Sequence, residues 1–191
     1  MKEIALHVLD LVENSARAGA KKVRIAIIED RKQNFFKLVI EDNGRGMSQE
    51  VLEKVKDPFF TGQHKKVGMG VSLLAQLAEQ CGGYLEVDSE EGRGTKVEAI
   101  FRRDHIDRPP MGDIPETLMV LLALYPDLEV EFEHVIDGSR WMMNSKELFQ
   151  NLGIKGSNDL GLLLPSIRDW MASQEENLLL KGGKIDENQD Y

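Results

Sequence analysis

Two pairs of apolar runs constrain the fold of this chain more than any other feature. Residues 22–30 (KVRIAIIED) and 35–42 (FFKLVIED) form the first pair, and residues 84–89 (YLEVDS) and 95–102 (TKVEAIFR) form the second. All four runs are rich in β-branched or aromatic side chains or alternate in polarity, which favours strands. The short polar links RKQN and EEGRG join the members of each pair, so each pair predicts a hairpin.

Three segments around these hairpins have helical periodicity. Residues 2–18, 48–56 and 70–81 place apolar side chains three and four positions apart. The loop of residues 57–69 separates the last two helices, and its length suggests a function. The order of helices and strands predicts a mixed sheet covered on one face by helices, which is a two-layer α+β sandwich.

The second half of the chain differs in composition and predicts a small α+β extension. Residues 104–115 hold three of the six prolines, which is typical of a linker. We expect a first domain at residues 1–103, a linker at 104–114, a small α+β region at 115–181 and a flexible tail at 182–191. The elements expected beyond the linker are a helix at 115–124, strands at 128–136 and 140–144, a short helix to 151, and a helical segment at 157–180 interrupted near Pro165.

The composition excludes several classes of protein. Apolar residues make up 41% of the chain and charged residues 30%, which fits a soluble globular protein. The net charge of −9 argues against a nucleic-acid partner, which basic side chains would have to hold. The single cysteine, Cys81, has no partner for a disulfide within the chain. No apolar run approaches the roughly 18 residues of a membrane span, so we expect a cytoplasmic protein without a membrane partner.

The segment EDNGRGM, residues 41–47, has a carboxylate at the end of a strand, followed by glycines. Asp42 could accept a hydrogen bond from an exocyclic amine, and Gly44 and Gly46 lack the Cβ atoms that would keep a flat ligand away. The same pattern also occurs in ordinary turns that follow strands. Taken alone, the segment leaves both interpretations open.

Two further segments have side chains that suit a phosphorylated ligand. Gly68 and Gly70 stand where a helix begins, and the free N–H groups of a helix N-terminus attract phosphate. Lys65 and Lys66 come just before them, and Thr95 offers a hydroxyl group that can donate and accept. An ordinary helix start and an ordinary hairpin turn would explain these segments equally well.

The first helix has a polar stripe opposite its apolar one. The residues of this stripe are Glu3, His7, Asp10, Asn14 and Arg17. An amide oxygen suits Mg²⁺, and a carboxylate one turn earlier could accept a proton. The alternative is a solvated face, since every amphipathic helix has one.

The order and spacing of these segments resemble the GHKL family of ATP-binding domains. That family includes sensor histidine kinases, anti-sigma-factor kinases, type II topoisomerases, heat-shock chaperones and MutL. VENSARAGA resembles its N box, EDNGRGM its first glycine box, KKVGMGVSLL its second and GRGTKVEAIF its last. PFFTG resembles the histidine-kinase stretch that leads into the ATP lid. The match covers about residues 1–103, and it implies the fold of that family.

The resemblance also implies a role for each matching residue. Asn14 would coordinate Mg²⁺, and Asp42 would accept from the adenine amino group with help from Thr95. Residues 57–69 would form the ATP lid. The residues expected to bind ATP are Asn14, Asp42, Gly44, Gly46, Lys65, Lys66, Gly68, Gly70 and Thr95.

One position departs from the family pattern. Four residues before its magnesium asparagine the family usually has Glu, or His in some histidine kinases, whereas this chain has Asp10, which is one methylene shorter. Asp10 is the candidate base. Glu13 is a second candidate, which adjoins Asn14 but points about 100° away from it on the helix. His7 is expected on the site wall or at the surface. The resemblance therefore implies binding of ATP and Mg²⁺ and leaves open whether ATP is consumed.

Three functions fit these expectations. The chain begins almost at the N box, without a phosphoacceptor hairpin before it, which favours a stand-alone regulatory kinase that phosphorylates or sequesters a separate protein. The second function is a non-catalytic ATP sensor whose residues 104–191 form an interaction module. The third is an ATPase switch of the chaperone or MutL type. The expected partners are ATP, a protein partner or phosphoacceptor and, as one option, a second copy of the chain.

Overall fold

The computed structural model describes residues 3–56 and 69–183. Its helices are α1 (Ile4–Arg17), α2 (Gln49–Lys56), α3 (Met69–Gln80), α4 (Ile114–Leu124), α5 (Ser145–Leu152) and α6 (Ser157–Gly183). Its strands are β1 (Lys22–Asp30), β2 (Phe35–Asp42), β3 (Tyr84–Glu90), β4 (Gly94–Arg102), β5 (Glu129–Ile136) and β6 (Ser139–Asn144). None of the helices described is both long enough and apolar enough to cross a membrane.

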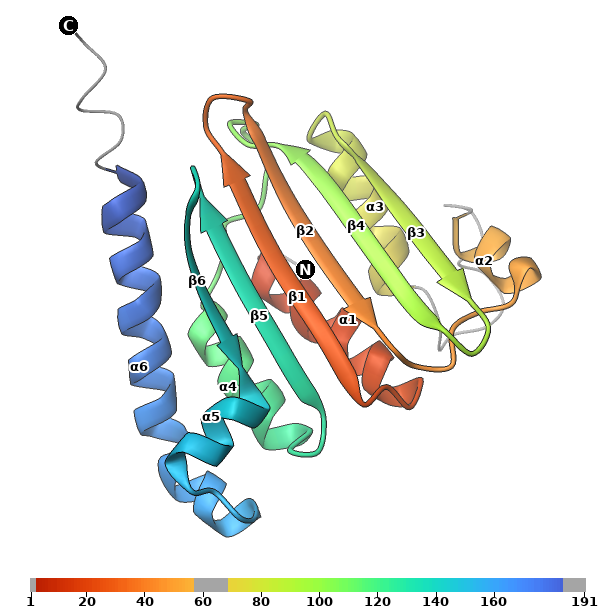
Figure 1. Cartoon of the computed structure of the whole chain (residues 1–191). Coiled ribbons are helices and arrows are strands. Elements are labelled where there is room, and N and C mark those ends of the chain that lie inside the picture. The colour runs from red at the N-terminus through yellow and green to blue at the C-terminus, as the bar shows by residue number, and fades with distance from the viewer. Residues whose placement is uncertain (1–2, 57–68, 184–191) are drawn as a thin grey trace, which may run out of the picture.

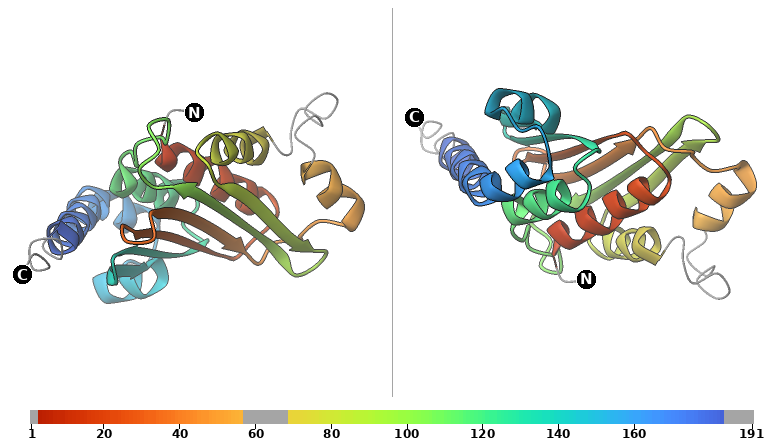
Figure 2. Two further views of the ribbon diagram at one scale, coloured as in Figure 1. Left: turned by 90° about the horizontal axis from the view of Figure 1, so that it is seen from above. Right: turned by 90° about the horizontal axis from the view of Figure 1, so that it is seen from below.

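The described strands form one mixed six-stranded sheet in the order β3-β4-β2-β1-β5-β6. β1 and β5 run parallel, and the other neighbours are antiparallel. Helices α1, α3 and α4 cover one face of the sheet, whereas α5 lies on the other side (Figures 1 and 2). The predicted α+β sandwich with a mixed sheet is confirmed.

Alternating side chains build the core between the sheet and its helices. The helix-facing side chains of β1 and β2 include Val23, Ile25, Ile27, Phe36, Leu38 and Ile40, each at most 2% exposed. Helix α1 buries its own apolar stripe against them. Each such side chain contributes about 1.5–3 kcal/mol through burial. This is why the sequence alternation located β1 and β2 correctly.

Strands from both halves of the chain share this sheet. β5 pairs with β1 along its whole length, so that Phe132 lies beside Ile25 and His134 beside Ile27. The division into a domain, a linker and a small C-terminal region stays a prediction. The structure adds that a single sheet runs through both of the predicted units.

The segment predicted to be a linker also holds the start of the first helix. The backbone N–H groups of Ile4 and Ala5 donate to the carbonyl oxygens of Pro110 and Met111, at 3.0 and 2.9 Å. Glu3, at the N-cap position, makes no side-chain hydrogen bond to the helix. The carbonyl groups of the linker therefore replace a capping side chain for N–H groups that a helix leaves unpaired.

The last helix departs from one expectation. α6 continues through Pro165, so the predicted interruption is wrong. Its buried side chains include Ile167, Met171 and Leu178, each at most 3% exposed, and the helix packs against α4 and β6. This packing keeps the segment helical even though a proline removes one backbone hydrogen bond.

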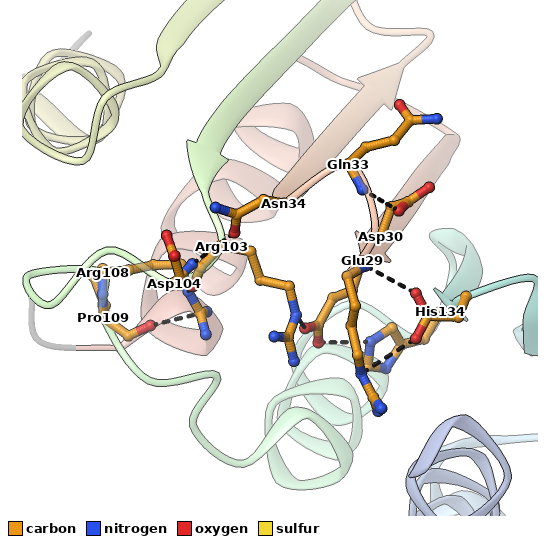
Figure 3. A network of polar contacts seen from close by, with 11 residues as sticks. Glu29, Asp30, Gln33, Asn34, Arg103, Asp104, Arg108, Pro109 and His134 are labelled. Carbon is orange, nitrogen blue, oxygen red and sulfur yellow. Dashed lines mark hydrogen bonds and ion pairs between the residues drawn. The ribbon is translucent and has the colours of Figure 1, made fainter. Parts of the chain in front are cut away.

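A buried polar cluster joins α6 to the sheet. His134 has no exposed surface, and its Nδ1 lies 2.7 Å from Oε1 of Glu175 on α6. Its Nε2 lies 3.5 Å from Oε1 of Glu29 on β1, a distance at which the attraction is electrostatic rather than a well-formed hydrogen bond. Nε of Arg103 donates to Glu29 at 2.9 Å (Figure 3). Burial opposes a charge on the ring, but the two carboxylates outweigh it and raise the pKa of His134.

Candidate functional site

Asp42, the last residue of β2, lies in a fixed position beside the first helix. Its Oδ1 accepts from the backbone N–H of Gly44 at 2.8 Å, and its Oδ2 accepts from the hydroxyl group of Ser15 at 2.6 Å. Ser15 is 4% exposed and lies on the sheet-facing side of α1. One lone pair on each oxygen is thus used, and each carboxylate oxygen can still accept another donor.

Thr95 lies directly opposite Asp42 in the sheet. The two residues are register partners between β2 and β4, and Ser89 of β3 is the partner of Thr95 on the other side. The hydroxyl groups of Ser89 and Thr95 lie 2.9 Å apart, and Ser89 also donates to the carbonyl oxygen of Gly94. The strand ends therefore place one carboxylate and two hydroxyl groups in a row across the sheet, and the roles expected for Asp42 and Thr95 in binding ATP stay a prediction.

The glycines after Asp42 allow close packing of the chain on itself. A Cβ at Gly44 would lie 2.9 Å from Oδ1 of Asp42 and 3.0 Å from Cβ of Ala18. Gly46 has a φ of +64°, and a Cβ there would lie 2.0 Å from the carbonyl oxygen of Glu90. The fold itself thus demands glycine at both positions. That the flat adenine ring of ATP approaches Gly44 and Gly46 closely stays a prediction.

The polar stripe of α1 faces the start of α3. A Cβ at Gly70 would lie 1.6 Å from Oδ2 of Asp10, so this glycine leaves room for the Asp10 carboxylate. Asn14 is half-buried and lies one turn further along α1. α1 thus contacts the start of α3 through Asp10 and the end of β2 through Ser15, the residue after Asn14. Thr95 is the register partner of Asp42.

Two polar groups in this region are buried without a partner. Oδ2 of Asp10 and both ring nitrogens of His7 have no hydrogen-bond partner among the described residues. His7 is 2% exposed, so it is not a surface residue. Burial lowers the pKa of His7, while the nearby Asp10 carboxylate acts in the opposite direction. Burial therefore favours the neutral form of the His7 imidazole.

Three predicted residues fall outside the part of the chain that the structure describes. Lys65, Lys66 and Gly68, with most of the expected lid, lie outside the described residues. In contrast, Ser15 is a site residue that sequence reasoning missed, because its position fits the apolar stripe of α1. The available signal was its place directly after Asn14, in a helix otherwise lined there by aliphatic side chains.

Comparison with known proteins identifies the family. The family model described as histidine kinase-, DNA gyrase B-, and HSP90-like ATPase matches residues 2–105. Sensor kinase CckA of Brucella abortus is 39% identical over 92 residues, which are 47% of this chain and 10% of that kinase. Sporulation kinase D of Bacillus subtilis is 32% identical over 97 residues, which are 48% of this chain and 19% of that kinase. The chain thus spans less than a fifth of the length of these relatives.

Solved structures show the same fold. A structure of the Aquifex aeolicus MutL ATPase domain complexed with ADP aligns with 87% of this chain and 70% of the MutL chain, with a TM-score of 0.52 and 17% identity. At that identity the likeness shows the fold alone. The family model, in contrast, covers just over half of the sequence and includes α1, the end of β2 and β4. The chain therefore belongs to the histidine kinase-, DNA gyrase B- and HSP90-like ATPases, the GHKL family.

Proposed function

We propose that this chain binds ATP with Mg²⁺ and acts as a regulatory kinase of the histidine-kinase type on a separate protein. The observation that carries the proposal is the arrangement at Asp42. A carboxylate held by Ser15 and Gly44 has free acceptor capacity and lies opposite the hydroxyl group of Thr95. Such a pair of groups suits the amino edge of a purine, which offers an N–H donor beside a ring-nitrogen acceptor.

The residues present fit the two groups that the family implies. Asn14 would hold Mg²⁺ through its amide oxygen, and Mg²⁺ keeps several water ligands and needs few from the protein. Among the described residues no three or more His, Cys, Asp or Glu side chains gather as a metal site. This fits an ion that takes most of its other ligands from water and from the triphosphate. ATP supplies the phosphoryl group, and its acceptor would be a side chain of the partner protein.

The ATP proposal is tested by calorimetry with Asp42→Asn. Asparagine keeps an acceptor for the N–H of Gly44, but its NH₂ group cannot accept from an adenine amine. We expect ATP affinity to fall by about 1.5–3 kcal/mol, the range for a hydrogen bond to a charged group. Glu176→Gln, at an exposed position of α6, the helix that packs against the edge strand β6, serves as the control for the change of charge. Equal ATP affinity in Asp42→Asn and the parent protein would disprove the adenine assignment.

A non-catalytic ATP sensor is the second candidate, and Asp10 favours it. Its carboxylate is one methylene shorter than the usual glutamate, and Oδ2 is buried against the position of Gly70. A base held in that way reaches less far into the site, and catalytic geometry tolerates little displacement. The family membership and the Asp42 site are the same under both candidates.

One labelling experiment separates the two candidates. The purified chain is incubated with γ-labelled ATP and Mg²⁺, with and without lysate from its source. A kinase transfers label to a protein, and the Asp10→Ala variant should then lose that transfer while still binding ATP. Bound ATP with no labelled protein and no released phosphate would reject the kinase and leave the sensor.

A further inference from the structure

A groove follows the outer edge of the sheet, between α3 and β3. Its walls are α3, which contributes Val71 and Ala75, and β3, which contributes Leu85 and Val87. Val55 of α2 also lines the groove, which has a volume of about 440 Å³. The described lining residues include none of the predicted site residues, although Val71 follows Gly70 and Asp88 precedes Ser89, so the groove adjoins the candidate site.

One wall of the groove is an edge strand. β3 pairs with β4 on one side; on its other side the structure describes no strand, and α2 contacts it there (Figure 1). An edge strand presents backbone N–H and C=O groups that can pair with an added strand. The stretch that lines the groove, residues 85–88, offers about 13 Å of such edge.

The groove carries negative charge at its rim. Glu79 from α3 and Glu86 and Asp88 from β3 line it, and all three are exposed. Its described lining contains no lysine or arginine. A basic segment therefore complements the groove, whereas a second copy of this chain, with a net charge of −9, does so poorly.

We propose that the groove between α3 and the free edge of β3 binds an extended, basic peptide segment of a partner protein as an additional strand. Successive side chains of a strand point to opposite faces. In the bound segment, alternate small apolar side chains enter the groove over Ala75, Leu85 and Val87. The side chains between them are basic and lie beside Glu86 and Asp88. The occupant thus alternates basic and small apolar residues over about four to six positions.

The test uses the full chain, labelled with ¹⁵N and without nucleotide, so its result does not depend on the proposed function. A blocked hexapeptide that alternates lysine and valine is added up to about 1 mM, where even weak sites fill. The control peptide has the same composition with its lysines and valines in two blocks. We expect the amide signals of residues 71–79 and 85–88 to shift, the amides of 85–88 to gain protection from exchange, and the alternating peptide to bind at least tenfold more tightly.

Variants of the protein locate the site. Ala75→Trp fills the groove and should abolish binding, whereas Leu73→Trp, at an exposed position of the same helix, should not. Glu79→Gln with Glu86→Gln should weaken binding about three- to tenfold, because two exposed charge pairs are lost. Even if Ala75→Trp failed to fold, this second variant would still test the proposal.

The matched control for the charge change is Asp127→Asn with Glu176→Gln, two exposed carboxylates remote from the groove. Equal weakening by the two double variants would overturn the proposal, since only overall charge would then matter. Equal binding of the two peptides, shifts confined to other strands, or concentration-dependent broadening of residues 85–88 without any peptide would also overturn it. The last result would assign the edge to self-association.

Discussion

Replacing Glu175 by glutamine tests how the last helix is attached to the sheet. Oε1 of Glu175 lies 2.7 Å from Nδ1 of His134, and its Oε2 accepts from Nε1 of Trp141 at 2.7 Å. Glutamine has one acceptor oxygen and one NH₂ group. When His134 is protonated, the NH₂ group must therefore face a donor, whichever way the amide is turned.

The expected destabilisation follows from these contacts. One of the two hydrogen bonds to the Glu175 carboxylate is lost, which costs about 1.5–3 kcal/mol. The remaining hydrogen bond becomes weaker, because the glutamine oxygen carries no charge. His134 keeps Glu29 as a partner, so the ring is not left as an uncompensated buried charge. We expect Glu175→Gln to lower the free energy of unfolding by about 2–4 kcal/mol at about pH 6.

The loss depends on pH in a definite direction. Burial opposes the charged ring, but Glu175 and Glu29 outweigh it, so the pKa of His134 in the folded protein is raised. A histidine whose pKa is raised by folding stabilises the folded protein fully when the pH is below its pKa in the unfolded chain, about 6.5. This stabilisation is lost as the pH rises through the pKa in the folded protein. A neutral ring can also turn Nδ1 into an acceptor for the glutamine NH₂ group. The difference between parent and variant should therefore shrink toward about pH 9.

The measurement is urea unfolding followed by circular dichroism at both pH values. Glu176→Gln, the exposed neighbour on the same helix, is the control, and we expect it to change stability by less than about 0.5 kcal/mol. The reasoning fails if Glu175→Gln behaves like this control, or if its effect grows as the pH rises.

Three other substitutions test the candidate site. Gly46→Ala should destabilise the protein by about 2–4 kcal/mol in thermal or urea unfolding, because the positive φ and the carbonyl oxygen of Glu90 leave no place for a Cβ. Asn14→Ala should make ATP affinity nearly independent of Mg²⁺ in calorimetry with and without the ion; an unchanged dependence would point to another ligand. Asp10→Asn should tighten ATP binding about two- to fivefold by removing a negative charge near the phosphates, and should abolish any phosphate release. Weaker binding by Asp10→Asn would assign the carboxylate to binding instead.

Local patterns predicted the parts of the fold that depend on nearby residues. β1 and β2 match the predicted runs residue for residue, and α3 begins within one residue of its predicted start. Alternation and helical periodicity work here because each records which side chains are buried against the sheet. The same patterns do not predict that β1 pairs in parallel with β5. Alternation shows which face of each strand is buried, but it does not show which strands are neighbours when many residues separate them.

The buried polar contacts were the least predictable part. Ser15 fits the apolar stripe of its helix, and only the folded chain brings its hydroxyl group to Asp42, 27 positions further on. His134 is a polar side chain at a buried, inward-facing position of an alternating strand, and its partner Glu175 lies 41 positions away. Both contacts depend on how separate elements are placed, which periodicity does not record.

Gly70 shows that a glycine in a sequence motif can have a second physical reason. The sequence links Gly70 to the free N–H groups of a helix start that attract phosphate, but in the structure the space of its missing Cβ is taken by Oδ2 of Asp10. The positive end of the α3 dipole attracts that carboxylate as it would attract a phosphate. The candidate base and the triphosphate would therefore compete for the same helix end. If the phosphates displace Asp10, the carboxylate becomes free to act as a base; if Asp10 stays, ATP is bound without being consumed.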